Sequence, residues 1–291
     1  MFAIETYYRP HSVKEACARL HQESGSRLIA GGTDVLIRLR EGKKEFGQLV
    51  DIHGLPELSR LEQCGDGTLM LGSGVTFSQL IHFLQSQRLL PALVEGASAI
   101  GGPQVRNMAT LGGNICNGAP SADSAAPLLV MDADVHIQGY KASRVVSLGD
   151  FYQGPGRVEL APDEVVTHFS INPACYQDTG SYFYKYAMRK AMDIATIGCA
   201  AACQIHHGII RSFKIAYTVA APVPKRCYQA EKIAEDAQVS QALIRDMASV
   251  VLEDLSPRES WRAGKAFREH IIRTLAQKVI LKAMIRGGAD L

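Results

Sequence analysis

The sequence has 291 residues, which is enough for two or three domains that each have a hydrophobic core. Apolar residues make up 47% of it and charged residues 21%, as in an ordinary soluble globular protein. Lysine and arginine number 31 against 29 acidic residues, and no block of like charge stands out, which argues against a nucleic-acid-binding surface.

The chain shows no sign of a membrane segment or of an oxidising compartment. No run of about 18 apolar residues occurs, and the first residues lack the basic and apolar regions of a secretory signal. The seven cysteines are odd in number and scattered. Cys199 and Cys203 are four residues apart without a matching second pair, so we expect packing thiols in a cytoplasmic protein and no metal site. Cys116 stands in a glycine-rich motif, where small-residue filler is the simpler interpretation.

The first 54 residues predict a small βαβ-like unit. Ser12 and Glu15 form a capping box for a helix that ends near Ser24. A short strand over 27–30 runs directly into Gly31 and Gly32, and a buried strand follows over 48–53.

Residues 55–174 predict a second α+β unit. A strand over 68–74 precedes a helix that Thr76 and Gln79 cap, and another helix covers 91–99. A long stretch rich in glycine and asparagine then leads to the apolar residues 126–137 and the alternating residues 144–152. No internal repeat or low-complexity linker appears.

From about residue 175 the pattern changes to strands followed by helices. Residues 182–190, 198–208 and 212–220 predict three antiparallel strands, with a tight turn at His207 and Gly208. Residues 225–236, 240–255 and 260–286 predict helices, the last of which Gly287 and Gly288 stop. We therefore expect a separate C-terminal α+β domain.

Two glycine loops, at residues 30–34 and 111–123, are the candidate binding elements. Gly31 and Gly32 leave the backbone accessible to a diphosphate, and Thr33 adds a hydroxyl group. Asp34 would repel phosphate, so we expect its carboxylate to brace the loop by accepting neighbouring N–H groups. The alternative is two surface turns that happen to contain paired glycines. No Walker, nucleophile-elbow or zinc-protease motif occurs, and Phe77 breaks a possible dinucleotide motif at residues 72–77.

The two loops together resemble the FAD-binding subunits of the xanthine dehydrogenase family, the molybdenum hydroxylases. The stretches AGGTDVLIRLR and ATLGGNICNGAPSADSAAPLL carry the resemblance, and YKYAMRKAMDIATIGCAA extends it into the C-terminal part. It implies an α+β fold with a vanillyl-alcohol-oxidase (PCMH)-type FAD-binding domain over 1–174, divided into subdomains of about 1–54 and 55–174. A C-terminal domain of the CO dehydrogenase flavoprotein type, with a three-stranded antiparallel sheet and helices, would follow over 175–291.

The resemblance also implies a set of flavin-binding residues. The diphosphate would lie between the two loops, and Asp123 would bind the ribityl chain. Ile100 and Val166 would flank the isoalloxazine, and Lys185 would lie near its polar edge. Plain core packing is the alternative for Ile100 and Val166, and a solvated strand charge for Lys185. The implied residues are Leu28, Ile29, Ala30, Gly31, Gly32, Thr33, Asp34, Val35, Ile100, Thr110, Gly113, Asn114, Asp123, Val166 and Lys185.

The family's electron path implies the partners. A large subunit with a molybdenum cofactor oxidises the substrate, and two [2Fe–2S] clusters on a small subunit pass electrons to FAD, which reduces NAD. The version of the second loop is similar to that of xanthine dehydrogenases, which convert hypoxanthine and xanthine to urate. The alternatives are a flavin subunit of a hydroxylase for nicotinate, another N-heterocycle or an aromatic CoA thioester, and an assembly or binding protein without turnover.

Overall fold

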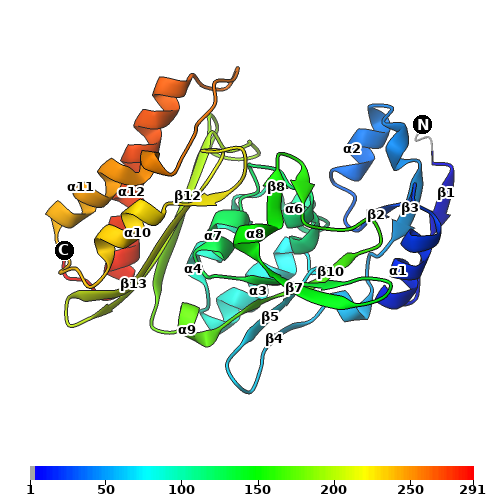
Figure 1. Cartoon of the computed structure of the whole chain (residues 1–291), viewed down its shortest axis with the longest axis horizontal. Coiled ribbons are helices and arrows are strands. Elements are labelled where there is room, and N and C mark those ends of the chain that lie inside the picture. The colour runs from blue at the N-terminus through cyan, green and yellow to red at the C-terminus, as the bar shows by residue number, and fades with distance from the viewer. Residues whose placement is uncertain (1–3) are drawn as a thin grey trace.

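The computed structural model describes residues 4–291, and of Lys44 only the backbone. Apart from the two-stranded pair of β8 (Tyr152–Gly154) and β9 (Arg157–Val158), three sheets follow one another along the long axis of the molecule (Figure 1). A three-stranded sheet lies at the N-terminal end, a five-stranded sheet with several helices lies in the middle, and a four-stranded sheet with its own helices lies at the C-terminal end.

The N-terminal part is the predicted βαβ unit. Its strands are parallel in the order β1-β3-β2. Ser12 caps α1 by accepting the Glu15 N–H, as predicted, but the Glu15 carboxylate accepts from the His11 N–H, so the capping box is not completed. The elements are β1 (Thr6–Tyr8), α1 (Val13–Gln22), β2 (Arg27–Ile29), α2 (Val35–Arg40), a 3₁₀ turn (Lys44–Phe46) and β3 (Gln48–Asp51).

The middle part is built on an antiparallel sheet in the order β4-β5-β10-β6-β7. Thr76 and Gln79 form the predicted capping box of α3. The sheet contains β4 (Leu61–Gln63), β5 (Leu69–Gly72), β6 (Asp134–Gln138), β7 (Ser143–Ser147) and β10 (Val165–Ile171). The helices are α3 (Phe77–Gln87), α4 (Pro91–Ser98), α5 (Pro103–Arg106), α6 (Leu111–Cys116) and α7 (Ala125–Leu129). Smaller elements are a 3₁₀ turn (Pro56–Leu58), α8 (Leu148–Phe151), β8 (Tyr152–Gly154), β9 (Arg157–Val158) and α9 (Pro173–Tyr176).

The C-terminal part is an antiparallel sheet in the order β11-β12-β13-β14, with helices on one face. The turn between β12 and β13 has positive φ at His207 and Gly208, as predicted. The strands are β11 (Gly180–Tyr186), β12 (Ile197–His206), β13 (Ile209–Thr218) and β14 (Lys225–Arg226). The helices are α10 (Tyr228–Ala234), α11 (Gln241–Val250), a 3₁₀ turn (Val251–Glu253) and α12 (Lys265–Arg286).

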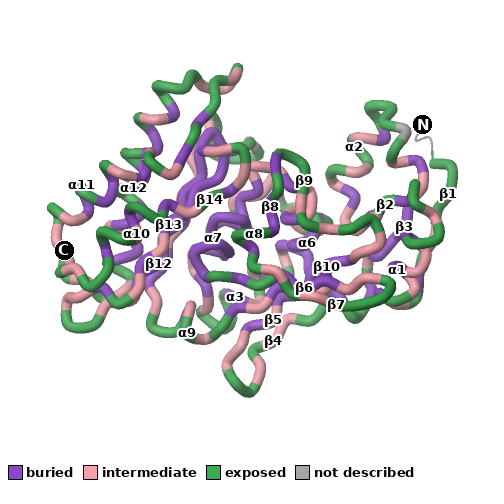
Figure 2. Tube along the Cα trace, viewed as in Figure 1, coloured by how far each residue is buried: buried purple, intermediate pink, exposed green. Residues whose placement is uncertain are grey.

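Strand β12 is buried on both faces, which joins the middle and C-terminal parts (Figure 2). Ala200 and Ala202 belong to the large core that the middle part builds. Cys199, Ala201 and Cys203 alternate with them and belong to the core formed with α10, α11 and α12. The apolar, small-residue run of this strand therefore reflects a sheet covered by helices on both sides.

Two predicted helices differ from the observed ones. Residues 225–236 begin as strand β14, because Lys225 and Arg226 pair with β13 and Glu231 holds the Arg226 guanidinium. The helix predicted over 260–286 begins only at Lys265, since Gly264 is its N-cap and Ser260 pairs with Ala263 in an isolated bridge. Among residues 4–291, no helix has both the length and the apolar character needed to cross a membrane.

We predict that Arg268 stabilises the start of α12. Its side chain is 1% exposed, and it donates to the Thr196 carbonyl and the Ser260 hydroxyl. Arg268→Met should lower the free energy of unfolding by about 2–3 kcal/mol, because a charged donor is lost and a buried carbonyl is left without a partner. Urea unfolding measures the change. Arg273→Met, on an exposed position of the same helix, should stay within about 0.5 kcal/mol of the unchanged protein; equal effects of the two substitutions would contradict the prediction.

Candidate functional site

The first glycine loop presents a row of free backbone donors. It connects the end of β2 to α2, and Gly32 has a φ of +71° there. In the part of the chain that the structure describes, none of the N–H groups of residues 31–35 donates to a protein acceptor. Consecutive free amides of this kind bind phosphate oxygens without adding a mobile charge. The loop therefore fits an anionic ligand such as a diphosphate.

The two glycine loops lie against each other. A Cβ atom on Gly31 would lie 1.8 Å from the Met108 carbonyl oxygen, just before the second loop. The Arg38 guanidinium of α2 donates to the Asn117 side chain at 2.8 Å, beyond the end of α6. The structure thus brings together segments about eighty residues apart in the sequence. The close approach of the Met108 carbonyl therefore requires a glycine at position 31. The sequence had instead predicted that this glycine makes room for a diphosphate.

The second loop forms the start of α6, and its own contacts occupy its backbone donors. The Thr110 hydroxyl oxygen accepts the Gly113 N–H at 3.1 Å, and the N–H groups of Leu111 and Gly112 donate to Val75 and Ser73. The Asn114 amide oxygen accepts from the Ser124 hydroxyl. Of the residues expected to face a diphosphate here, Gly113 is exposed, Asn114 is half-buried and Thr110 is buried. This loop can therefore offer the Asn114 amide group and an open surface at Gly113.

The expected bracing role of Asp34 is wrong. Its side chain is exposed and caps no N–H group at the start of α2. Its backbone is helical, with φ −103° and ψ −44°, whereas side chains that cap a helix project from an extended residue. For Cys116 the structure favours packing, because burial raises the pKa of its thiol to about 12 and keeps it protonated.

Lys185 and Asp123 form a nearly buried ion pair beneath a cavity. The Lys185 ammonium, on β11, lies 2.7 Å from Asp123 Oδ2 and 2.9 Å from the Ala99 carbonyl oxygen. The two side chains are 11% and 6% exposed, so the solvated-charge alternative for Lys185 is wrong. Burial raises the pKa of Asp123 to about 6, although the Lys185 charge and hydrogen bond act to lower it. Asp123 Oδ1 is buried without a hydrogen-bond partner.

The cavity has a volume of about 690 Å³ and lies between residues 95–106 and residues 183–193. Lys185, Arg106 and Arg189 line it. Ile100 is half-buried beside the lining residues. Val166 is only 4% exposed and packs in the large core, which favours the core-packing alternative for it. Its contact with a flavin stays a prediction.

Arg106 is a lining residue that the sequence analysis missed. Its guanidinium donates to the carbonyl oxygens at the end of α4 and beyond. Nothing in the local sequence pattern indicates this, because the contact depends on how residues 98–106 turn back.

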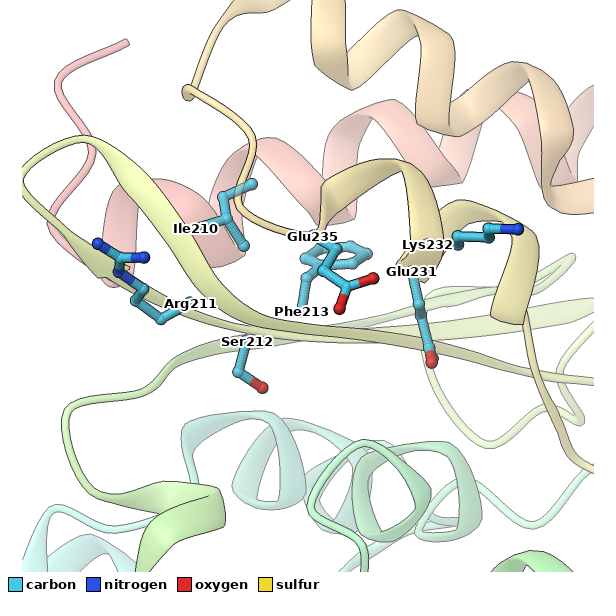
Figure 3. A pocket seen from close by; sticks show the side chains of 7 residues that line it. All are labelled: Ile210, Arg211, Ser212, Phe213, Glu231, Lys232 and Glu235. Atoms are coloured by element: carbon cyan, nitrogen blue, oxygen red, sulfur yellow. The ribbon is translucent and has the colours of Figure 1, made fainter.

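A smaller pocket of about 260 Å³ lies in the C-terminal part, between β13 and α10 (Figure 3). Two of its charged residues have partners already, since Arg211 pairs with Asp236 and Glu231 pairs with Arg226. No group of three or more potential metal-ligating side chains occurs within residues 4–291. The glycine loops and the larger cavity are therefore the candidate site.

The family follows from comparison with known proteins. Residues 2–174 match the family described as "FAD binding domain in molybdopterin dehydrogenase", and residues 182–283 match "CO dehydrogenase flavoprotein C-terminal domain". The chain belongs to this family of flavin subunits. It is 45% identical over 291 residues, the whole of both chains, to the "Xanthine dehydrogenase FAD-binding subunit" of Escherichia coli O157:H7. It is 30% identical over 283 residues to the "Carbon monoxide dehydrogenase medium chain" of Hydrogenophaga pseudoflava, covering 96% of this chain and 97% of that one.

Solved structures confirm the predicted fold class. Carbon monoxide dehydrogenase from Hydrogenophaga pseudoflava superposes with a TM-score of 0.93 at 28% identity, covering 98% of this chain and 99% of that one. Quinoline 2-oxidoreductase from Pseudomonas putida 86 gives a TM-score of 0.91 at 25% identity, covering 99% and 100%. The fold is thus that of a PCMH-type FAD-binding subunit.

The residues present fit FAD. The free N–H groups of residues 31–35 suit the diphosphate of this flavin subunit's cofactor. The buried, partnerless Asp123 Oδ1 is an acceptor that a ribityl hydroxyl would satisfy. The cavity beside Lys185 is large enough to hold the isoalloxazine ring. The individual residue contacts with FAD remain predictions.

We predict that Gly32→Val removes FAD while leaving most of the fold. A β-branched residue at φ +71° is strained by about 1–3 kcal/mol, and its Cβ would lie 3.2 Å from the Leu36 side chain, so the backbone that carries the free amides has to shift. Flavin content after purification and the FAD dissociation constant measure the effect. Gly54→Val is the matched control, since Gly54 has a φ of +77° and no atom near its would-be Cβ. Normal FAD content in Gly32→Val would show that this loop does not bind the diphosphate.

We also predict a pH dependence from Asp123. Its pKa of about 6 in the folded protein exceeds the ordinary value near 3.8, so the folded state binds this proton more tightly than the unfolded state. Its contribution to the free energy of unfolding should therefore fall, by about 1–3 kcal/mol, as pH rises from about 4 to about 6. Urea unfolding of flavin-free protein and of Asp123→Asn across this range measures it. The wild-type minus variant difference should fall with rising pH, and a constant difference would contradict the assignment.

Proposed function

We propose that this chain is the FAD-binding electron-transfer subunit of a xanthine dehydrogenase-type enzyme that oxidises hypoxanthine and xanthine to urate. The observation that carries the proposal is the 45% identity, over the full length of both chains, to the Escherichia coli xanthine dehydrogenase FAD-binding subunit. In this proposal a small partner subunit supplies electrons from [2Fe–2S] clusters, a large partner subunit holds the molybdenum cofactor, and NAD is the acceptor.

FAD supplies the conversion between single-electron and two-electron transfer, and the chain positions it. The amides of residues 31–35 would bind the diphosphate through fixed dipoles. Asp123 would accept from the ribityl chain, and Lys185 keeps that carboxylate in place while adding positive charge beside the cavity. The open cavity leaves one side of the site accessible to a second ligand, which we assign to the nicotinamide.

A second candidate is the flavin subunit of a hydroxylase for nicotinate, another N-heterocycle or an aromatic CoA thioester. The chain is 31% identical over 205 residues to the "Nicotinate dehydrogenase FAD-subunit" of Eubacterium barkeri, covering 68% of each chain. The lower identity and coverage favour the xanthine dehydrogenase assignment. The free thiols of all seven cysteines are consistent with the expected cytoplasmic location.

Reconstitution tests the proposal. The purified chain with FAD should pass electrons from NADH to an artificial acceptor but should not oxidise xanthine, because in this proposal the molybdenum cofactor is held by the large partner subunit. Mixing it with an iron–sulfur subunit and a molybdenum subunit should produce urate and NADH together. Controls are each component alone and a mixture that contains Gly32→Val. Xanthine turnover by the isolated chain, or unchanged NAD-linked turnover by partners without it, would contradict the proposal, and turnover of nicotinate in place of xanthine would support the second candidate.

A further inference from the structure

Four consecutive carbonyl groups at the end of α4 are bound by cationic side chains. Arg106 Nη1 lies 3.2 Å from the Ser98 oxygen, 2.9 Å from the Ile100 oxygen and 3.4 Å from the Gly101 oxygen. The carbonyl between them, that of Ala99, accepts from Lys185 at 2.9 Å. Two cations from different segments thus hold one short stretch of backbone at the edge of the cavity.

This arrangement fixes where the following N–H groups point. In a trans peptide the C=O and N–H bonds point in opposite directions, and the described chain contains no cis peptide. The Gly101 N–H shares a peptide plane with the Ile100 carbonyl, and the Gly102 N–H shares one with the Gly101 carbonyl. Because Arg106 binds both carbonyls, both N–H groups face away from its guanidinium.

The same two N–H groups have no protein partner. Within residues 4–291, neither Gly101 nor Gly102 donates a backbone hydrogen bond, and Pro103 has no N–H to offer. Both glycines line the cavity, and Gly102 is buried. A buried amide without an acceptor is unfavourable in an isolated protein, and such a group commonly marks a ligand.

We propose that Arg106 is a positioning residue for the flavin: it directs the Gly101 and Gly102 amides to the polar edge of the isoalloxazine. This inference rests on the proposed FAD function. The pyrimidine end of the ring carries carbonyl oxygens that accept from such amides, and it holds the negative charge of the reduced, deprotonated flavin. Two aligned amides beside a guanidinium and an ammonium stabilise that charge, so Arg106 raises the reduction potential.

A purely structural role for Arg106 gives a different expectation. A cation at a helix C-terminus satisfies free carbonyls and stabilises the helix end, and its loss would lower stability alone. The flavin potential and spectrum distinguish the two roles, since bracing of α4 by itself would change neither in a folded, FAD-loaded protein.

The test compares three variants of the full chain loaded with FAD. Arg106→Met removes the charge and the guanidinium donors, Arg106→Lys keeps the charge without the guanidinium, and Arg211→Met removes an exposed arginine of the C-terminal part that pairs with Asp236. For each we measure the FAD dissociation constant, the visible spectrum, the two-electron midpoint potential and thermal unfolding.

We expect Arg106→Met to weaken FAD binding about tenfold, shift the flavin absorption bands and lower the midpoint potential. A tenfold change in the redox equilibrium corresponds to about 30 mV. Arg106→Lys should fall between this variant and the wild type, and Arg211→Met should match the wild type in every flavin measurement.

Two outcomes would overturn the inference. One is a wild-type potential and spectrum in Arg106→Met; where that variant does not fold, a wild-type potential and spectrum in Arg106→Lys decides the same way. The other is an equal shift of the midpoint potential in Arg211→Met, which would show that the loss of any positive charge from the protein produces the effect. Failure of the wild-type chain to bind FAD contradicts the proposed function itself, and so the two failures are distinguishable.

Discussion

The buried ammonium of Lys185 joins the two segments that line the cavity and also binds Asp123. It comes from β11 in the C-terminal part and binds Asp123 and the Ala99 carbonyl in the middle part. Removing both charges of such a pair from water is costly, and the cost is offset only by close contact and additional hydrogen bonds. The incomplete compensation is visible at Asp123, whose second oxygen lacks a partner and whose pKa is raised. The buried Asp123 carboxylate is therefore incompletely stabilised in the protein alone, and a ligand that donates a hydrogen bond to it would lower its free energy.

The three parts of the chain contribute different chemistry to this site. The N-terminal loop offers backbone dipoles at residues 31–35, the middle part offers a carboxylate and the turn after α4, and the C-terminal sheet offers a cation. In the proposed function, fixed dipoles suit the diphosphate, whose charge stays the same throughout the reaction. Side-chain cations lie instead beside the cavity, where the proposal places the flavin ring, whose charge changes. The backbone dipoles and the side-chain cations lie at different places because they come from different parts of the chain that pack against one another.

Local signals in the sequence predicted much of this architecture, and contacts between distant segments account for the rest. The capping box at Thr76, the Ser12 cap and the turn at His207 depend on neighbouring residues, and the structure contains all three. The second bond of the predicted box at Ser12 differs, because the Glu15 carboxylate accepts from the His11 N–H. The sequence predicted the loops at Gly31 and Gly112 as binding elements because each contains paired glycines next to a helix or strand. Arg106 gave no signal, since its partners are carbonyl groups reached by a turn of the backbone. Such contacts cannot be predicted from neighbouring residues, because the backbone turn that brings the carbonyl groups to Arg106 exists only in the folded chain.

The small side chains of β12 limit which amino-acid substitutions this strand can accept. Ala200 and Ala202 lie between the sheet and the middle part, and the side chains of the next residues along fill the opposite layer. Their size sets the spacing between the two layers, and hence how closely Lys185 on the neighbouring strand approaches the segment after α4. A bulkier residue at either alanine would act as a wedge beneath the cavity floor. These two positions are thus constrained as spacers of a site that their side chains do not line.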